Sequence, residues 1–163
     1  MENPKRYPPK PDRKRLRLKG FDYSNPTQVY FLTICASEGT SPFLDKDLST
    51  QIIKSVLFYR NQKGIRLYSY CVMPDHFHLV MSPANGFGVS QLVRNLKTYT
   101  TKLAQEKGLN GKLWQKSFYD HILRKDESLL KICEYVFANP VRKGLVARPE
   151  EWAYSGMPDP LPL

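Results

Sequence analysis

The sequence predicts an α+β domain built on an antiparallel sheet, and three observations support this prediction. Stretches rich in β-branched and aromatic residues alternate with stretches whose apolar residues recur at helical spacing. Only Pro74-Asp75 separates two of the strand-like stretches, as in a hairpin. A chain of 163 residues with 41% apolar content suits one compact domain with its own core. The order strand, helix, strand, strand, helix, strand, helix matches the split βαβ of ferredoxin-like folds with one appended helix.

The first half of the chain supplies three strands and one helix. Residues 28–35 are continuously apolar and rich in β-formers, which is typical of a central strand. Asp47 or Ser49 is expected to cap a helix that runs to about residue 62 and ends at Gly64. Residues 66–73 and 76–82 form the hairpin, and residues 83–86 end the sheet.

The second half supplies two helices and one strand. Residues 90–107 form a basic amphipathic helix, in which Tyr99 has the spacing of a core position. Residues 113–124 form a loop that enters a fourth strand. Asp126 is expected to cap the last helix and Pro140 to end it. The buried stripe of that helix is expected to be Leu129, Leu130, Cys133 and Val136.

The two ends differ in composition from the domain that residues 20–155 are expected to form. Residues 1–19 hold eight Lys and Arg among four prolines, a composition that cannot bury a core. We expect a flexible basic arm, which either lies on a phosphate backbone or merely increases solubility. Residues 156–163 form a proline-rich tail.

A formal net charge of +10 on so small a chain points to a polyanionic partner, with nucleic acid ahead of anionic lipid. No basic helix with a clean apolar face favours a lipid surface. No apolar run of 18 residues and no signal peptide is present, so we expect a cytoplasmic protein without a membrane span. Cys35, Cys71 and Cys133 form no C-x-x-C pair and are expected to be small core residues.

Two of the three histidines lie two residues apart on the predicted third strand. Side chains alternate along a strand, so His76 and His78 share one face while Phe77 and Leu79 point into a core. Neutral imidazoles are common ligands of divalent metals. The alternative is a pair of polar strand residues that face water.

Tyr135 and Asn139 lie four residues apart at the end of the last helix, hence on one face. We expect that face to look across at the histidine strand. A tyrosine hydroxyl, with an ordinary pKa of about 10, is a poor nucleophile unless a cation or base activates it or polarises its target. A metal on the histidines could polarise a phosphate for attack by Tyr135, and the amide of Asn139 could ligate the same ion. The alternative is a core tyrosine on an amphipathic helix.

Several blocks in this order carry a family resemblance: residues 73–79 (MPDHFHL), 113–115 (LWQ), 118–124 (FYDHILR), 135–146 (YVFANPVRKGLV) and 152–155 (WAYS). Together they resemble the REP-associated tyrosine transposases, which are single-tyrosine HUH transposases. The resemblance covers about residues 28–155, and residues 20–155 then correspond to one HUH transposase-like catalytic domain.

The resemblance implies a site and a reaction. His76 and His78 match the metal ligands, Tyr135 matches the nucleophile, and Asn139 stands where insertion-sequence relatives have a glutamine as third ligand. The implied ion is Mg²⁺ or Mn²⁺, although two imidazoles favour softer ions than Mg²⁺. The family cleaves single-stranded DNA, leaves a 5′-phosphotyrosine and a free 3′-OH, and recognises a hairpin with a short flanking tetranucleotide. REP-associated members look like monomers, so we expect a monomer, with a dimer as the alternative.

Other candidates have two interpretations. His121 either lines the site or makes a structural hydrogen bond, and Asp75 either supports a histidine or serves the turn. Tyr99 is the competing nucleophile, and we prefer Tyr135. Phosphate contacts are expected from Arg94, Lys97, Lys102, Arg124, Arg142 and Lys143.

Two other classes of function compete with DNA nicking and joining. One is a binding module without cleavage activity, either a domesticated hairpin-DNA binder or a ferredoxin-like RNA binder. No aromatic RNP-type segment favours the RNA binder. The other is a histidine-triad nucleotide hydrolase, but Val80 occupies the position of its third histidine.

Overall fold

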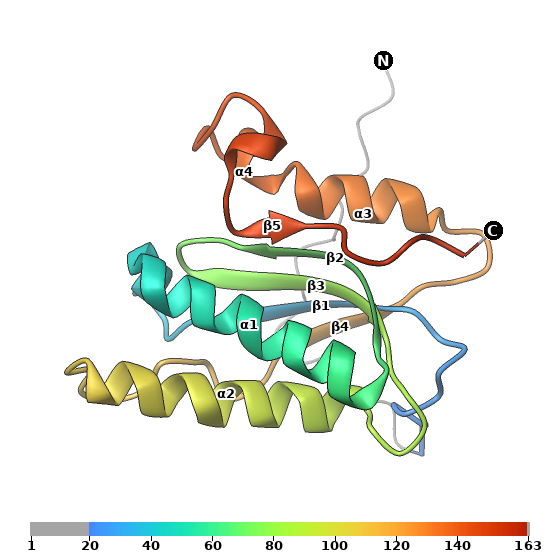
Figure 1. The fold of residues 1–163 in the computed structure, drawn as a ribbon, viewed down its shortest axis with the longest axis horizontal. Helices are drawn as coiled ribbons and strands as arrows, with labels where there is room; N and C mark the ends of the chain where they lie inside the picture. The colour runs from blue at the N-terminus through green and yellow to red at the C-terminus, as the bar shows by residue number, and fades with distance from the viewer. Residues whose placement is uncertain (1–19, 163) are drawn as a thin grey trace.

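The computed structural model describes residues 20–162, so the basic arm predicted for residues 1–19 lies outside the described part. Its centre is a five-stranded sheet of order β4-β1-β3-β2-β5 in which all pairs are antiparallel (Figure 1). This confirms the predicted α+β fold with an antiparallel sheet. The elements are β1 Tyr30–Cys35, α1 Lys46–Lys63, β2 Arg66–Val72, β3 His76–Ser82, α2 Val89–Glu106, β4 Tyr119–Ile122, α3 Leu129–Phe137, α4 Asn139–Arg142 and β5 Ser155–Gly156, with 3-10 turns η1 Pro42–Leu44 and η2 Pro149–Glu151.

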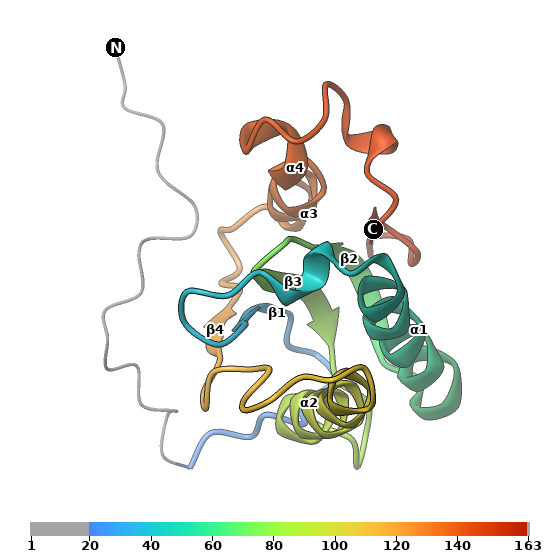
Figure 2. The same ribbon diagram turned by 90° about the vertical axis from the view of Figure 1, so that its left-hand side faces the viewer.

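Helices cover both faces of the sheet: α1 and α2 lie on one face and α3 on the other (Figures 1 and 2). Strand alternation sends Leu32 and Phe77 to the larger core under α1 and α2. It sends Phe31 and Val80 to a smaller core, where they pack with Cys133 of α3. His76 and His78 share the parity of Val80 on β3, so the sheet presents both histidines on the face of α3.

The caps of two helices differ from the sequence predictions. Asp45, rather than Asp47 or Ser49, caps α1, because its carboxylate accepts hydrogen bonds from the backbone N–H of Asp47 and Leu48. Ser128, rather than Asp126, caps α3 and accepts from the N–H of residue 131. In both cases the cap is the residue with extended backbone directly before the first helical turn.

Two predicted core positions are also wrong. Leu130 is 48% exposed, and Ile132 takes its place in the buried stripe at 4%. The buried positions follow the spacing 129, 132, 133 and 136 once α3 begins at Leu129, so residue 130 lies off that face. Tyr99 is 44% exposed on α2 and is not a core residue.

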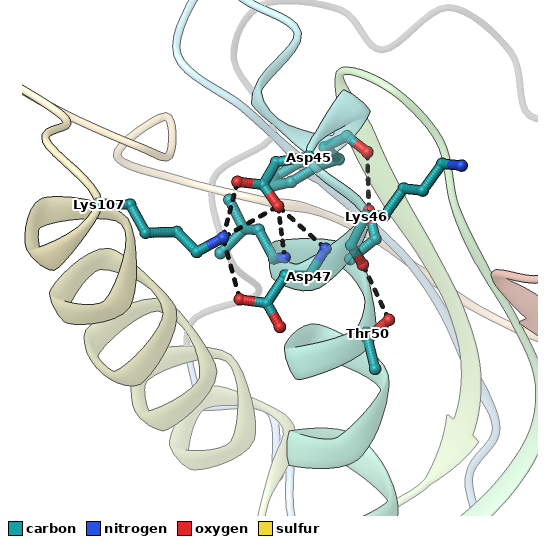
Figure 3. Close-up of polar contacts among 8 residues, drawn as sticks. Asp45, Lys46, Asp47, Thr50 and Lys107 are labelled. Carbon is teal, nitrogen blue, oxygen red and sulfur yellow. Dashed lines mark hydrogen bonds and ion pairs between the residues drawn. The ribbon is translucent and has the colours of Figure 1, made fainter.

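The end of α2 is tied to the start of α1 by Lys107 (Figure 3). Its ammonium lies 2.9 Å from a carboxylate oxygen of Asp45 and 2.9 Å from one of Asp47. All three side chains are well exposed, so the pairs add little stability on their own. They link the ends of two adjacent helices, and Asp45 is also the cap of α1.

The proline-rich tail is attached to the edge of the sheet beyond β5. The N–H of the buried Asp159 donates to the carbonyl of Leu67 (3.1 Å), and its carboxylate accepts from the N–H of Leu67 (2.7 Å) and from Nε of Arg60 (2.9 Å). Trp152, which precedes β5, lies at the other end of β2, where Nε1 donates to the carbonyl of Val72 (3.0 Å). Within residues 20–162, no helix combines the length and the apolar character that crossing a membrane requires.

Candidate active site

The histidine pair lies on β3, which is hydrogen-bonded between β1 and β2. The Nε2 atoms of His76 and His78 approach to 3.1 Å, and the imidazole centroids are 4.5 Å apart. His78 is 5% exposed, whereas His76 is half-buried at the sheet's end. The predicted same-face arrangement is therefore present, with the two ring nitrogens converging on one point.

The Nδ1 atom of each imidazole, on the side of the ring away from the other histidine, has a polar partner. Asp75 places a carboxylate oxygen 2.7 Å from Nδ1 of His76, and Thr33 of β1 places its hydroxyl 3.0 Å from Nδ1 of His78. Because an ionised carboxylate only accepts hydrogen bonds, Nδ1 of His76 is the donor in this contact. Asp75 thus has the supporting contact that was one of its two predicted roles.

Burial holds the pKa of His78 well below its usual value, and the charge of His76 and the nearby charges of Arg142 and Lys143 lower that pKa further. A histidine with a lowered pKa stays neutral at physiological pH, the form that ligates metals. Arg142, at the end of α4, and Lys143, the next residue, therefore lie close enough to His78 to act on it electrostatically.

The histidine pair fits a divalent cation. Ligands about 2.1 Å from an ion subtend close to a right angle when they lie 3.1 Å apart, which suits neighbouring positions of an octahedral site. Within residues 20–162, no third His, Cys, Asp or Glu completes a cluster with this pair. Among residues 20–162, a further protein ligand would therefore be a group of another kind, such as an amide.

Asn139 is 2% exposed and lies at the junction of α3 and α4. In the described part of the chain, no hydrogen bond joins its side chain to either histidine. Its role as the third ligand therefore remains a prediction.

Tyr135 lies on α3, above the histidine face of the sheet, and is half-buried. The ring of Phe31 lies 5.3 Å from that of His78 and 6.3 Å, edge to face, from that of Tyr135. Tyr135 and His78 thus flank the same phenylalanine, on one side of the sheet and within one chain.

Arg142 of α4 holds the tyrosine hydroxyl. The centre of its guanidinium lies 3.7 Å from the centroid of the Tyr135 ring, and Nη2 donates a 2.9 Å hydrogen bond to Oη. Arg142 was predicted to contact phosphate, and no pattern in the sequence indicated this contact with Tyr135.

His121 of β4 pairs with Phe31 of β1 and so lies on the face of α3. Its Nε2 is 2.9 Å from each carboxylate oxygen of Glu127, and Glu127 also accepts from the N–H of Arg124 at 2.7 Å. His121 therefore fixes the loop between β4 and α3. Glu127 was not among the predicted site residues. The one feature of the sequence that could have indicated it is its position in the loop just before α3, the helix that carries Tyr135.

The predicted phosphate-binding residues divide between the two faces. Arg94 and Lys102 are exposed on α2, on the face opposite the histidines. The ammonium of Lys97 donates to the carbonyls of residues 115 (2.8 Å) and 117 (3.1 Å), contacts that favour a structural role. Arg124, Arg142 and Lys143 are exposed on the side of α3 and α4.

Tyr99, the competing nucleophile, lies on α2 and donates to the side-chain carbonyl of Gln51 at 3.3 Å. The sheet separates α2 from the histidine face, so the geometry favours Tyr135.

Comparison with known proteins identifies a family. The family model described as "Transposase IS200 like" matches residues 27–139, a range that includes both histidines, Tyr135 and Asn139. The chain belongs to this family. A Haemophilus influenzae protein named "Putative REP-associated tyrosine transposase" is 28% identical over 138 residues, covering 78% of each chain. The Escherichia coli REP-associated tyrosine transposase is 24% identical over 102 residues, covering 62% of this chain and 59% of its own.

A solved structure of a REP-associated tyrosine transposase bound to a REP hairpin has a similar fold, with a TM-score of 0.68 and 19% identity, covering 85% of this chain and 82% of that one. At this level of identity the likeness establishes the fold alone.

Proposed function

We propose that this protein nicks and rejoins single-stranded DNA next to a hairpin, through a covalent 5′-phosphotyrosine on Tyr135. The observation that carries the proposal is the converging Nε2 pair of His76 and His78 on the face of the sheet that α3 covers with Tyr135. Membership of the IS200-like transposase family supports it. So does the similar structure, whose protein is bound to a REP hairpin.

The reaction exchanges one phosphodiester for another. Oη of Tyr135 attacks the scissile phosphorus, the bond to the 3′ oxygen breaks, and the phosphate stays on the tyrosine. The phenol loses its proton and the 3′ oxygen gains one, which leaves a free 3′-OH. Rejoining is the reverse, in which a 3′-OH attacks the phosphotyrosine and Tyr135 departs. His76 and His78, with Asn139 as the proposed third ligand, would hold a Mg²⁺ or Mn²⁺ ion, which would supply Lewis-acid stabilisation of the phosphate.

Arg142 positions Tyr135 in both directions of this exchange. The guanidinium stacks on the ring and so restricts the rotamer of Tyr135. It also donates a hydrogen bond to Oη, the atom whose bond to phosphorus breaks during rejoining. A fixed positive donor at that oxygen favours the phenolate that forms there.

The proposed active form is a monomer that binds the DNA on the α3 side. Tyr135 and both histidines belong to one chain and share one sheet face, so no second copy is needed to complete the pair and the nucleophile. The exposed cations of that side, Arg124, Arg142 and Lys143, suit a phosphate backbone.

A denaturing-gel assay tests the proposal. Single-stranded hairpin oligonucleotides from the source genome, labelled at the 5′ or the 3′ end, are incubated with Mn²⁺ or with EDTA. The wild type is expected to form a protease-sensitive adduct on the 5′ phosphate only with Mn²⁺. Tyr135→Phe should form none but still bind the hairpin, and Tyr99→Phe should behave as the wild type does.

Two results would contradict the proposal. Loss of the adduct in Tyr99→Phe alone would move the nucleophile to α2. Hairpin binding by the wild type without any cleavage would instead support a domesticated binding module.

A further inference from the structure

An open pocket of about 540 Å³ lies beside Tyr135, between the loop that follows β4 and the first two turns of α3. Tyr135 forms one wall, and Lys131, four residues earlier on the same helix face, forms the next. Arg124 and Asp126 line the loop side. The function proposed above uses Tyr135 and, as a backbone contact, Arg124, and it assigns no role to Lys131 or Asp126.

The pocket combines two kinds of charged group. Arg124 and Lys131 are exposed cations at its edge, and Asp126 adds an exposed carboxylate. The second carboxylate in the lining, Glu127, is turned to His121 and to the N–H of Arg124, each at 2.9 Å or less. Its negative charge therefore faces the protein, while that of Asp126 stays available to a ligand.

This mixture suits a nucleotide better than a lone phosphate. Arg and Lys bind phosphate oxygens through charge-assisted hydrogen bonds. A carboxylate repels phosphate but accepts hydrogen bonds from the exocyclic amino group of cytosine and from similar groups of adenine and guanine. Thymine has no such amino group. Two cations and one carboxylate around one pocket thus match the two ends of a single nucleotide.

We propose that this pocket holds the nucleotide adjacent to the scissile phosphate, with Arg124 and Lys131 on its phosphate and Asp126 on the amino group of its base. The inference rests on the proposed function, because the phosphate attacked by Tyr135 fixes the neighbouring nucleotide at the pocket wall. The hydrogen bonds of Glu127 hold the loop in place before DNA arrives, which reduces the entropic cost of binding.

The pocket predicts a base preference at one position of the strand. Hairpin oligonucleotides carry thymine in turn at each position flanking the cleavage point, and single-turnover cleavage is compared with cytosine, adenine and guanine there. We expect thymine to lower the rate about tenfold at one position. Asp126→Ala should remove that difference and leave the other positions unchanged.

The phosphate contacts are tested by affinity. Lys131→Ala and Arg124→Ala are compared with Lys125→Ala, a neighbouring exposed lysine that does not line the pocket. Each protein is titrated with a hairpin that has the flanking strand and with the bare hairpin. We expect the first two variants to lose several-fold affinity for the flanked hairpin only, and Lys125→Ala to match the wild type.

The outcomes separate this inference from the proposed function. Equal cleavage with all four bases at every position, or equal effects of Lys131→Ala and Lys125→Ala, would overturn the pocket and leave the nicking reaction intact. Absence of cleavage by the wild type would remove the proposed function. The flanked-hairpin titration would still test the pocket in that case, since it measures binding alone.

Discussion

The hydroxyl of Tyr135 is held by Arg142, a residue seven positions later on another helix. We predict that Arg142→Lys lowers the single-turnover cleavage rate roughly tenfold to a hundredfold. A lysine keeps the charge but loses the planar group that stacks on the ring and donates to Oη at once.

Lys143→Ala is the matched control for Arg142→Lys, because it removes the neighbouring charge while leaving the contact with Tyr135 in place. It should weaken hairpin binding in a salt-dependent way and change the cleavage rate of saturated enzyme little. If both variants reduced affinity alone, Arg142 would be only a phosphate contact.

The histidine pair predicts a divalent-ion site that is measurable without DNA. Calorimetric titration with Mn²⁺ should show one site in the wild type and none in His78→Ala. Thr33→Val should weaken binding roughly tenfold, since the threonine hydroxyl orients His78 through Nδ1.

The third histidine of the chain provides the control for the metal site. His121→Ala should bind Mn²⁺ as the wild type does, because His121 pairs with Glu127 in the described structure. Unchanged Mn²⁺ affinity in His78→Ala would contradict the assigned ligand pair.

At the scale of elements, the carboxylate of Asp159 joins the segment after β5 to Arg60 of α1 and to Leu67 of β2 through hydrogen bonds. Burial by itself raises the pKa of Asp159, but hydrogen bonds from Arg60 and from the N–H of Leu67 outweigh it and hold the pKa below its ordinary value. We predict that Asp159→Asn reduces the free energy of unfolding by about 1–3 kcal/mol at pH 7.

The lowered pKa of Asp159 sets the pH window of that stabilisation. It is fully present above the unfolded-state pKa of about 3.9 and is lost as the pH falls through the lower, folded-state pKa. Urea unfolding curves at a series of pH values should show a constant difference from Asp159→Asn down to about pH 4 and a narrowing one below it. A difference that stayed constant down to about pH 2 would argue against a contribution from the ionised carboxylate.

The sequence predicted the elements well where a local signal exists. The Pro74-Asp75 turn and Gly64, with φ of 75°, ended β2 and α1 where expected. The caps were misplaced by two or more residues because acidic and hydroxyl residues cluster near both helix starts, and only the backbone conformation selects among them.

The candidate site was predictable only in part. Alternation along one strand puts His76 and His78 on one face without any tertiary information. Thr33 needs the register between β1 and β3, and the contact between Arg142 and Tyr135 needs the angle between α3 and α4. Those arrangements follow from packing between distant segments, which no local pattern records.

At the scale of the whole molecule, the excess positive charge is unevenly placed. Eight of the 25 Lys and Arg lie in residues 1–19, outside the described structure. We predict that deletion of residues 1–19 weakens hairpin binding and reduces its dependence on salt, without altering the position of cleavage. For each phosphate that the arm neutralises, its deletion should lower the slope of log affinity against log salt by roughly 0.7.

Fluorescence anisotropy at several salt concentrations measures that slope. A truncated protein with the same slope as the full chain would show that the arm does not bind the DNA.

The sheet has a separate core on each face, and the two differ in size. The larger core packs β3 against α1 and α2. The smaller core packs the sheet against α3, a helix of nine residues. Isolated helices of that length are unstable, so α3 depends on this packing and is the part that can detach by sub-global opening while the sheet persists. Tyr135 therefore lies on the element with the smaller apolar support, whereas His76 and His78 lie on a strand that is hydrogen-bonded on both sides. Local opening of α3 would move the tyrosine and leave the histidine pair in place.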